Sequence, residues 1–103
     1  MTQTYFLLLT ALPAFLQIPR AERDARAADA LAQAGLSQMR FFDAEAFSAQ
    51  CSDIAMVEGM SPTAFHRAME VLRDGPVFST PWFRLEAVIP TLENGHHMMR
   101  EGA

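Results

Sequence analysis

Residues 3 to 12, Gln-Thr-Tyr-Phe-Leu-Leu-Leu-Thr-Ala-Leu, decide the fold that we expect for this chain. The run ends at Pro13 and is far too short to span a membrane, so we interpret it as a β-strand. Both faces of this strand are apolar, with Tyr5, Leu7 and Leu9 on one face and Phe6, Leu8 and Leu12 on the other. A strand of this kind is buried on two sides.

The same segment has the apolar character of a secretory signal but lacks a positively charged start, because the first arginine is residue 20. We therefore prefer the buried strand and expect a cytoplasmic protein with no membrane partner.

Outward from this strand, the sequence predicts a helix over residues 20–34 that stops at Gly35. Its apolar stripe is predicted to consist of small side chains and one leucine: Ala21, Ala25, Ala28, Leu31 and Ala32. Strands are expected over residues 38–43 and 52–58, with a turn or short hairpin arm over residues 46–51 between them.

Ser61 and Pro62 predict the start of a second helix, with the serine as N-cap and the proline at the first helical position. The core face of this helix has the spacing i, i+3, i+4, i+7 and comprises Phe65, Ala68, Met69 and Leu72. Asp74-Gly75-Pro76 breaks the helix, and a last strand is expected over residues 82–89, ended by Pro90.

The predicted order strand-helix-strand-strand-helix-strand is typical of an α+β, ferredoxin-like βαββαβ sandwich. We expect this domain over residues 1–91 and a C-terminal tail over residues 92–103. Both predicted helices cover one face of the antiparallel sheet, while the strand over residues 3–12 is apolar on both. A second copy is the simplest cover for the other face, so we expect a homodimer of the dimeric α+β barrel type.

Composition supports an apolar partner or cavity. Hydrophobic residues make up 50% of the 103 residues, and charged residues make up 19%, against about 25% in an average domain. Seven methionines and eight phenylalanines favour an adaptable apolar surface. The net charge of −4 and the scattered arginines argue against a nucleic-acid partner. A single cysteine excludes an internal disulfide framework.

A central stretch carries a family resemblance. Arg40-Phe41-Phe42-Asp43-Ala44-Glu45-Ala46-Phe47, followed by Cys51-Ser52-Asp53, resembles the signature of the darcynin family of small bacterial proteins. Weaker similarities lie at residues 13–16, 20–23, 72–74, 89–90 and 93–94. The chain departs from the family pattern at Pro19, where members tend to have a helix-capping serine. The family has no assigned catalytic residues, so the resemblance implies an architecture and transfers no functional residue.

Asp43 and Glu45 are the first candidate catalytic residues. If the backbone is extended, both project from one face about 6.6 Å apart, flanked by Phe41 and Phe47. An aromatic setting raises the pKa of a carboxyl and suits it to proton transfer. The alternative is a pair of solvated surface carboxylates.

His66 and Arg84 complete the candidate catalytic set. His66 lies at the edge of the apolar face of its helix, one turn from Glu70, and is either a base or a surface histidine paired with that glutamate. Trp82, Arg84, Glu86 and Val88 are predicted to share one strand face. Arg84 there either contacts an anionic ligand or developing negative charge, or forms an interfacial ion pair.

Five further residues are candidates for ligand binding. Phe42, Met56 and Trp82 are expected to shape an apolar pocket. Arg40 is the alternative to Arg84 for stabilising developing negative charge, and Tyr5 is a further ligand-binding candidate. We expect no metal and no cofactor, because adjacent His96 and His97 diverge on any ordered element and no nucleotide-binding loop is present. Cys51 is expected to be a buried structural thiol.

These features leave two functions open. One is a small-molecule-binding protein or a cofactor-independent enzyme that acts on a hydrophobic metabolite by proton transfer, as in isomerisation, cyclisation or oxygenation. The alternative is a non-catalytic dimeric interaction or regulatory protein. A ligand-sized cavity beside Asp43, His66 or Arg84 distinguishes the first from the second.

Overall fold

A computed structural model describes residues 2–47 and 50–100 of the chain. The elements, in chain order, are β1 (Gln3–Ala11), α1 (Pro13–Leu16), α2 (Arg20–Gln33), β2 (Arg40–Asp43), β3 (Asp53–Glu58), α3 (Pro62–Asp74), α4 (Pro76–Ser79), β4 (Phe83–Leu92) and α5 (His97–Arg100). The expected α+β class is confirmed. The predicted turn over residues 46–51 includes residues 48 and 49, which lie outside the described residues.

The four strands form one antiparallel sheet in the spatial order β2-β3-β1-β4. In β1, Phe6 lies opposite Met56 of β3 on one side and Ile89 of β4 on the other. Two residues further along β1, Leu8 lies opposite Ile54 of β3 and Ala87 of β4. The register with β4 shifts between Leu8 and Leu9, which marks a bulge.

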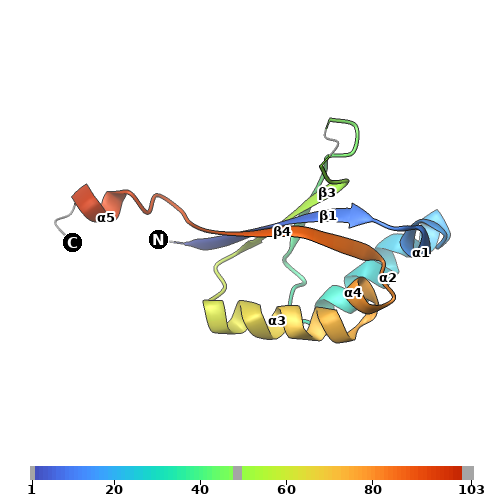
Figure 1. Cartoon of the computed structure of the whole chain (residues 1–103). Coiled ribbons are helices and arrows are strands. Elements are labelled where there is room, and N and C mark those ends of the chain that lie inside the picture. Colours follow the sequence, from blue (N-terminus) through green and yellow to red (C-terminus); the bar gives the residue numbers. More distant parts are fainter. Residues whose placement is uncertain (1, 48–49, 101–103) are drawn as a thin grey trace.

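The helices α2, α3 and α4 lie on one side of this sheet, and residues 44–47 and 50–52, between β2 and β3, rise from the other side (Figure 1). The hydrophobic core lies between sheet and helices, where Leu7, Leu36, Ala55, Ala68 and Leu72 are almost fully buried. In β1 the odd-numbered side chains Tyr5, Leu7 and Leu9 face this core. Their burial settles which apolar face of the strand belongs to the helices.

The side chains of the opposite parity form what we call the open sheet face, the sheet surface turned away from the helices. Its apolar members are Phe6, Leu8, Phe42, Ile54, Met56, Ala87 and Ile89. Phe42 is 43% exposed and Ile89 is 45% exposed. The chain itself therefore leaves a broad apolar sheet surface uncovered.

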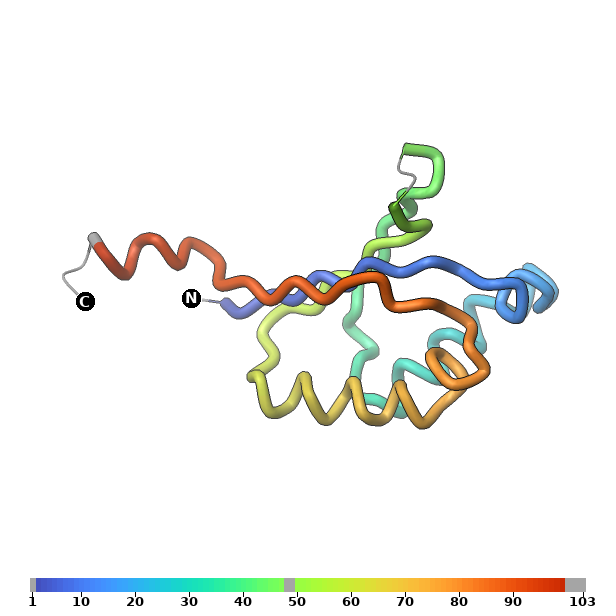
Figure 2. The backbone as a smooth tube through the Cα atoms, viewed as in Figure 1, coloured from blue at the N-terminus to red at the C-terminus, as the bar shows by residue number. Residues whose placement is uncertain are grey.

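The last strand runs further than the sequence predicts. Pro90 was expected to end it, yet β4 continues to Leu92 with Pro90 opposite Tyr5. Because β4 is an edge strand, it has an outer side with no neighbouring strand, and a residue without an N–H is tolerated there. The end of β4 and α5 project beyond the helical layer, at the end of the molecule where β1 begins (Figure 2).

The predicted stripe on the first long helix is confirmed at Leu31 and wrong at its four alanines. Ala21, Ala25, Ala28 and Ala32 are exposed, and α2 instead packs on the core through Ala30, Leu31 and neighbouring Ala34. Methyl groups occur on every side of this helix, so their spacing does not define a face.

The start and core face of α3 are confirmed. The Ser61 hydroxyl accepts a hydrogen bond from the Ala64 N–H at 3.2 Å, and Pro62 is the first helical residue. Phe65, Ala68 and Leu72 are buried, as predicted. No helix within residues 2–47 and 50–100 is long and apolar enough to cross a membrane.

Candidate functional site

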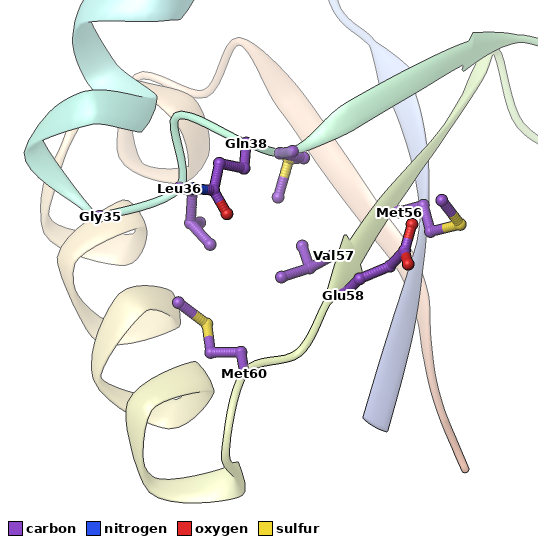
Figure 3. A pocket seen from close by; sticks show the side chains of 8 residues that line it. Gly35, Leu36, Gln38, Met56, Val57, Glu58 and Met60 are labelled. Carbon is purple, nitrogen blue, oxygen red and sulfur yellow. The ribbon is translucent and has the colours of Figure 1, made fainter. Parts of the chain in front are cut away.

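A pocket of about 280 Å³ opens at one end of the interface between the helices and the sheet. The segment from α2 to β2, the end of β3 and Met60, which lies between β3 and α3, form its walls (Figure 3). The lining residues are Gly35, Leu36, Gln38, Met39, Met56, Val57, Glu58 and Met60.

The end of α2 positions one wall. Gly35 adopts a φ of 74°, its N–H donates to the Ala32 carbonyl at 3.0 Å, and the Leu36 N–H donates to the Leu31 carbonyl at 2.8 Å. This pair of bonds is a Schellman motif, which a glycine in the left-handed region permits. It turns the chain so that Leu36, only 2% exposed, enters the core beside the pocket.

The interior of the pocket combines polar and apolar surface in similar amounts. Leu36, Val57 and Met60 point into it, and the Gln38 amide lies beside Leu36, on the wall formed by the segment from α2 to β2 (Figure 3). Methionine side chains are unbranched and polarizable, so they adapt to ligands of different shape. The amide offers both a donor and an acceptor. This arrangement suits a small apolar molecule with one polar group.

Met56 and Glu58 line the pocket only from the far side of β3. Their side chains project away from Val57, onto the open sheet face (Figure 3). There Glu58 lies 3.7 Å from Arg40 Nη1 in an exposed ion pair. Such a pair contributes little to stability.

The centre of the interface between the sheet and the helices is packed. The cavity there, lined by side chains such as Leu9, Leu31, Leu72 and Trp82, holds about 20 Å³. That is room for about one water molecule and for no metabolite.

Asp43 and Glu45 do not share an extended face, which corrects the prediction. Strand β2 ends at Asp43, and residues 45–47 form a turn in which the Glu45 N–H donates to Asp43 Oδ1 at 3.3 Å. An aspartate that binds the backbone two residues on favours a turn over a longer strand. Both residues are exposed, and Phe47 is 93% exposed.

His66 lies on the exposed side of α3. Its side chain is 77% exposed, and Nε2 lies 3.7 Å from Glu70 Oε1. The geometry matches the surface-pair alternative. Asp43 and Arg84 belong to opposite edge strands of the sheet, so the four candidate catalytic residues are not brought together within one chain.

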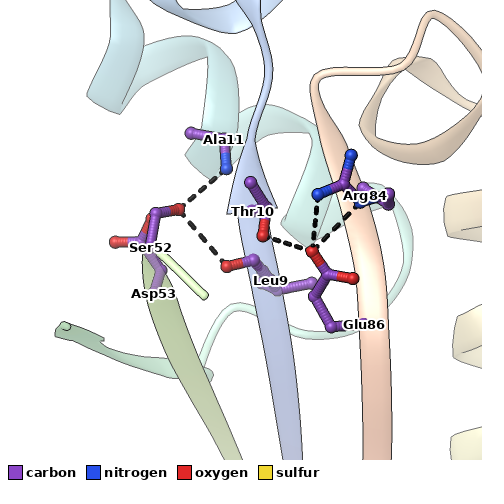
Figure 4. Close-up of polar contacts among 7 residues, drawn as sticks. All are labelled: Leu9, Thr10, Ala11, Ser52, Asp53, Arg84 and Glu86. Atoms are coloured by element: carbon purple, nitrogen blue, oxygen red, sulfur yellow. Dashed lines mark hydrogen bonds and ion pairs between the residues drawn. The ribbon is translucent and has the colours of Figure 1, made fainter. Parts of the chain in front are cut away.

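Arg84 forms a polar cluster on β4. Its Nε donates to Glu86 Oε2 at 3.0 Å, Nη2 lies 2.9 Å from the same oxygen, and the Thr10 hydroxyl donates to it at 2.5 Å (Figure 4). The Arg84 hydrogen bond, followed by that from Thr10, holds the pKa of the Glu86 carboxyl below its ordinary value. The same hydrogen bond and charge raise the pKa of Arg84.

The predicted alternation of Trp82, Arg84, Glu86 and Val88 on one face is wrong. Trp82 precedes the strand and is 8% exposed in the core, and Val88 lies opposite Leu7 on the helical side. The bulge after Leu85 shifts the alternation by one residue, which an unbroken period of two does not anticipate.

The five predicted ligand-binding residues divide between two surfaces. Tyr5 and Trp82 belong to the core, where Tyr5 stacks on Phe65. Arg40, Phe42 and Met56 lie together on the open sheet face, with Arg40 opposite Met56 and its guanidinium 5.4 Å from the Phe42 ring centroid. Only Met56 also borders the 280 Å³ pocket.

Cys51 is buried, as expected. The described residues contain no group of three histidine, cysteine or acidic side chains placed to hold a metal ion.

The sequence reasoning missed every residue of this pocket except Met56, including Leu36, Gln38 and Met60, which face its interior. The signal for them is the sequence Ala34-Gly35-Leu36, in which a glycine C-cap is followed by an apolar residue. That pattern predicts a Schellman motif but does not reveal that β3 leaves space beside it.

Comparison with known proteins gives two relatives. The chain is 50% identical over 58 residues to "Darcynin" of Chromobacterium violaceum, an alignment that covers 56% of this chain and 73% of that protein. It is 34% identical over 59 residues to "Darcynin 1" of Acinetobacter baumannii, covering 57% of this chain and 66% of that protein. No family model matches the chain.

Proposed function

The chain belongs to the darcynin family, and we propose that it is a homodimeric protein that binds a small hydrophobic molecule. The observation that carries the proposal is the 280 Å³ pocket, close to the lower end of the volumes of known ligand sites. We infer that its apolar side chains, such as Leu36, Val57 and Met60, supply affinity through burial and that the Gln38 amide supplies orientation through a hydrogen bond.

Binding without a chemical step fits the pocket better than proton-transfer catalysis. A general base has to lie within hydrogen-bond reach of the ligand. Glu58 is the one carboxylate among the described lining residues, and it projects to the far side of β3 (Figure 3). We therefore favour a binding protein over a proton-transfer enzyme. We infer no cofactor for either.

Three features support a ferredoxin-like fold for each subunit. The major elements follow the order β1-α2-β2-β3-α3-β4, and β1 occupies the sheet interior between β3 and β4. Both long helices lie on the same side of the sheet (Figure 1). This is the arrangement of a split βαβ unit.

The open sheet face supports a homodimer of the dimeric α+β barrel type. Two adjacent rows across the sheet are apolar apart from Arg40, and polar groups border them at both ends, with Glu58 at one and the Arg84–Glu86 pair at the other. An apolar centre with a polar rim is the usual anatomy of an interface.

Charge favours the same face for self-association. The two arginines and two glutamates around the open sheet face cancel, whereas the whole chain carries −4. The excess negative charge lies elsewhere and repels a second copy at other surfaces. We infer that two chains pack with these faces together.

A non-catalytic dimeric interaction protein without a ligand is the second candidate function. The packed space of about 20 Å³ between the centre of the sheet and the helices favours it. Both candidate functions include the proposed homodimer, so only ligand binding distinguishes one function from the other.

Native mass spectrometry of the purified protein tests the proposal. We expect each chain to retain a small organic molecule, and Gln38→Leu to lose it because the substitution removes the amide while keeping a similar volume. Gln17→Leu, at an exposed position after α1, is the matched control and should retain it. A ligand-free wild type that a panel of hydrophobic metabolites does not stabilise against heat would favour the second candidate.

A further inference from the structure

The last described residues of the chain form an arm, which we define as residues 93–100 and call the C-terminal arm. It extends past α2, α3 and α4, none of which lies over it (Figure 2). The molecule measures 53 × 30 × 20 Å, and its radius of gyration is 15.1 Å. A compact chain of this length has a radius of gyration of about 13 Å. The C-terminal arm therefore lies outside the compact part of its own chain.

A local turn sets the direction of the C-terminal arm. The Glu93 N–H donates to the Thr2 carbonyl at 2.9 Å, and Asn94 then adopts a φ of 54°. Asparagine enters this left-handed region more readily than most residues. The Gly95 N–H donates back to the Leu92 carbonyl at 3.0 Å. Beyond Glu93, no backbone hydrogen bond within the described residues ties the arm to the sheet.

The C-terminal arm carries exposed apolar side chains. Met98 is 46% exposed and Met99 is 79% exposed. Both belong to α5, a helix of four residues. An isolated helix shorter than about 12–15 residues is marginal in water, because most helical stability in proteins comes from packing on other elements. Methionine adapts its shape to the surface that it contacts. These properties suit a segment that packs against another molecule.

The proposed homodimer needs more surface than the apolar rows of the open sheet face supply. These two rows, interrupted only by Arg40, cross all four strands. Strands lie about 4.8 Å apart and side chains on one face repeat about every 6.7 Å, so the rows cover roughly 250 Å² in projection. A stable interface buries about 800 Å² of accessible surface on each partner. Even if side-chain relief doubles the projected area, about 300 Å² on each partner has to come from the polar rim or from another segment.

We propose that the C-terminal arm packs against a second copy of this chain and supplies part of that area. The inference rests on the proposed homodimer and adds a second contact to it. Strand β4 runs from Ile89 of the open sheet face into the arm, so the arm begins at the margin of the proposed interface. In a two-fold dimer each copy contributes one arm and receives one.

Charge favours a second copy as the partner of the arm. Residues 94–100 contain one arginine, two histidines and no acidic residue, whereas the whole chain carries −4. The arm is therefore attracted to the negatively charged body of another copy. It does not reach the helical layer of its own chain, because it leads away from that layer (Figure 2).

Sedimentation equilibrium of the full chain with two methionines replaced tests the inference. Met98→Gln combined with Met99→Gln keeps two long side chains but makes both polar. We expect the dimer dissociation constant to rise about tenfold or more, because two apolar side chains no longer gain from burial. Leu16→Gln is the matched control. It changes a 50% exposed apolar residue of α1, at the other end of the molecule, and should dimerise as the wild type does (Figure 1).

Hydrogen exchange of the wild type, followed by mass spectrometry, reads the arm directly. In the dimer the amides of residues 97–100 should exchange about tenfold or more slowly than in the diluted monomer, because packing on a second copy protects α5. Protection in both samples would mean that the arm packs on its own chain. Protection in neither would mean that it packs on nothing. Each of these two results would overturn the inference.

The dissociation constants separate this inference from the proposed function. Equal values for the wild type and the methionine double variant would overturn the role of the arm and leave the homodimer intact. A wild type that stays monomeric would overturn both. Retention of a ligand is measured at other residues, those of the 280 Å³ pocket, so its outcome is independent of the arm.

Discussion

Tyr5 of β1 and Phe65 of α3 stack face to face, with ring centroids 3.9 Å apart and an interplanar angle of 1°. Both are almost fully buried, and the stack joins the centre of the sheet to the helical layer. The Tyr5 hydroxyl is buried with no hydrogen-bond partner among the described residues. The ring therefore stabilises the fold while the hydroxyl opposes it.

This relationship predicts opposite effects for two substitutions of Tyr5. Tyr5→Phe keeps the stack and removes the unsatisfied hydroxyl, so the free energy of unfolding should stay equal or rise by up to about 1 kcal/mol. Tyr5→Ala should lower it by about 3–5 kcal/mol through the cavity it leaves. Urea denaturation followed by circular dichroism measures both. A large loss in Tyr5→Phe would instead show that the hydroxyl has a partner.

The proposed homodimer makes Leu8 the sensitive position of β1. Leu8→Glu should convert a micromolar dimer into an 11.4 kDa monomer, because burying an unpaired carboxylate costs several kcal/mol. Val71→Glu, at an exposed apolar position of α3, is the matched control and should remain dimeric. Sedimentation equilibrium reads the mass of each. A wild type that sediments at 11.4 kDa would contradict the proposed assembly.

We expect the contribution of the Glu86 carboxyl to the stability of the fold to depend on pH. Its folded pKa lies below its ordinary value because of the Arg84 and Thr10 hydrogen bonds. A carboxyl whose pKa is depressed by folding stabilises the fold at pH values above its unfolded pKa and loses that contribution as the pH falls through the folded one. Glu86→Gln should thus be less stable than wild type at pH 7, and the difference should shrink below about pH 4.3, the reference value for glutamate.

Thermal unfolding at several pH values measures this difference. The control is Glu45→Gln, because the Glu45 side chain makes no hydrogen bond or ion pair with the described residues. Its stability should follow the wild type at every pH. A Glu86→Gln difference that stays constant from pH 7 to acid would show that Arg84 does not act on this carboxyl in solution.

We expect removal of the Ser61 N-cap to cause a modest loss of stability. Ser61→Ala removes the acceptor for the Ala64 N–H and should cost about 1 kcal/mol of unfolding free energy. Thr63→Ala, two residues later and exposed, should change it by less than about 0.5 kcal/mol. Chemical denaturation of the two variants side by side is the measurement, and equal stability would mean that water replaces the cap.

Local signals in the sequence determined much of this fold. The start of α3 is defined by Ser61, which accepts a hydrogen bond from a backbone N–H, and by Pro62, which has no N–H to satisfy. The buried face of α3 is defined by the spacing of Phe65, Ala68 and Leu72. Gly35 ends α2 because only its left-handed backbone closes the helix there without strain. Each of these signals acts within a few residues, so the sequence alone was sufficient.

Only the tertiary structure decided which face of each strand packs against the helices and which face stays uncovered. Both sides of β1 are apolar, and the helices' position selects Leu7 for the core and leaves Leu8 on the open sheet face. The bulge that places Glu86 beside Arg84 and the space beside Gln38 arise from pairing and packing between segments far apart in the chain. Periodicity reports the two faces of a strand or helix, but the partner on each face comes from long-range packing.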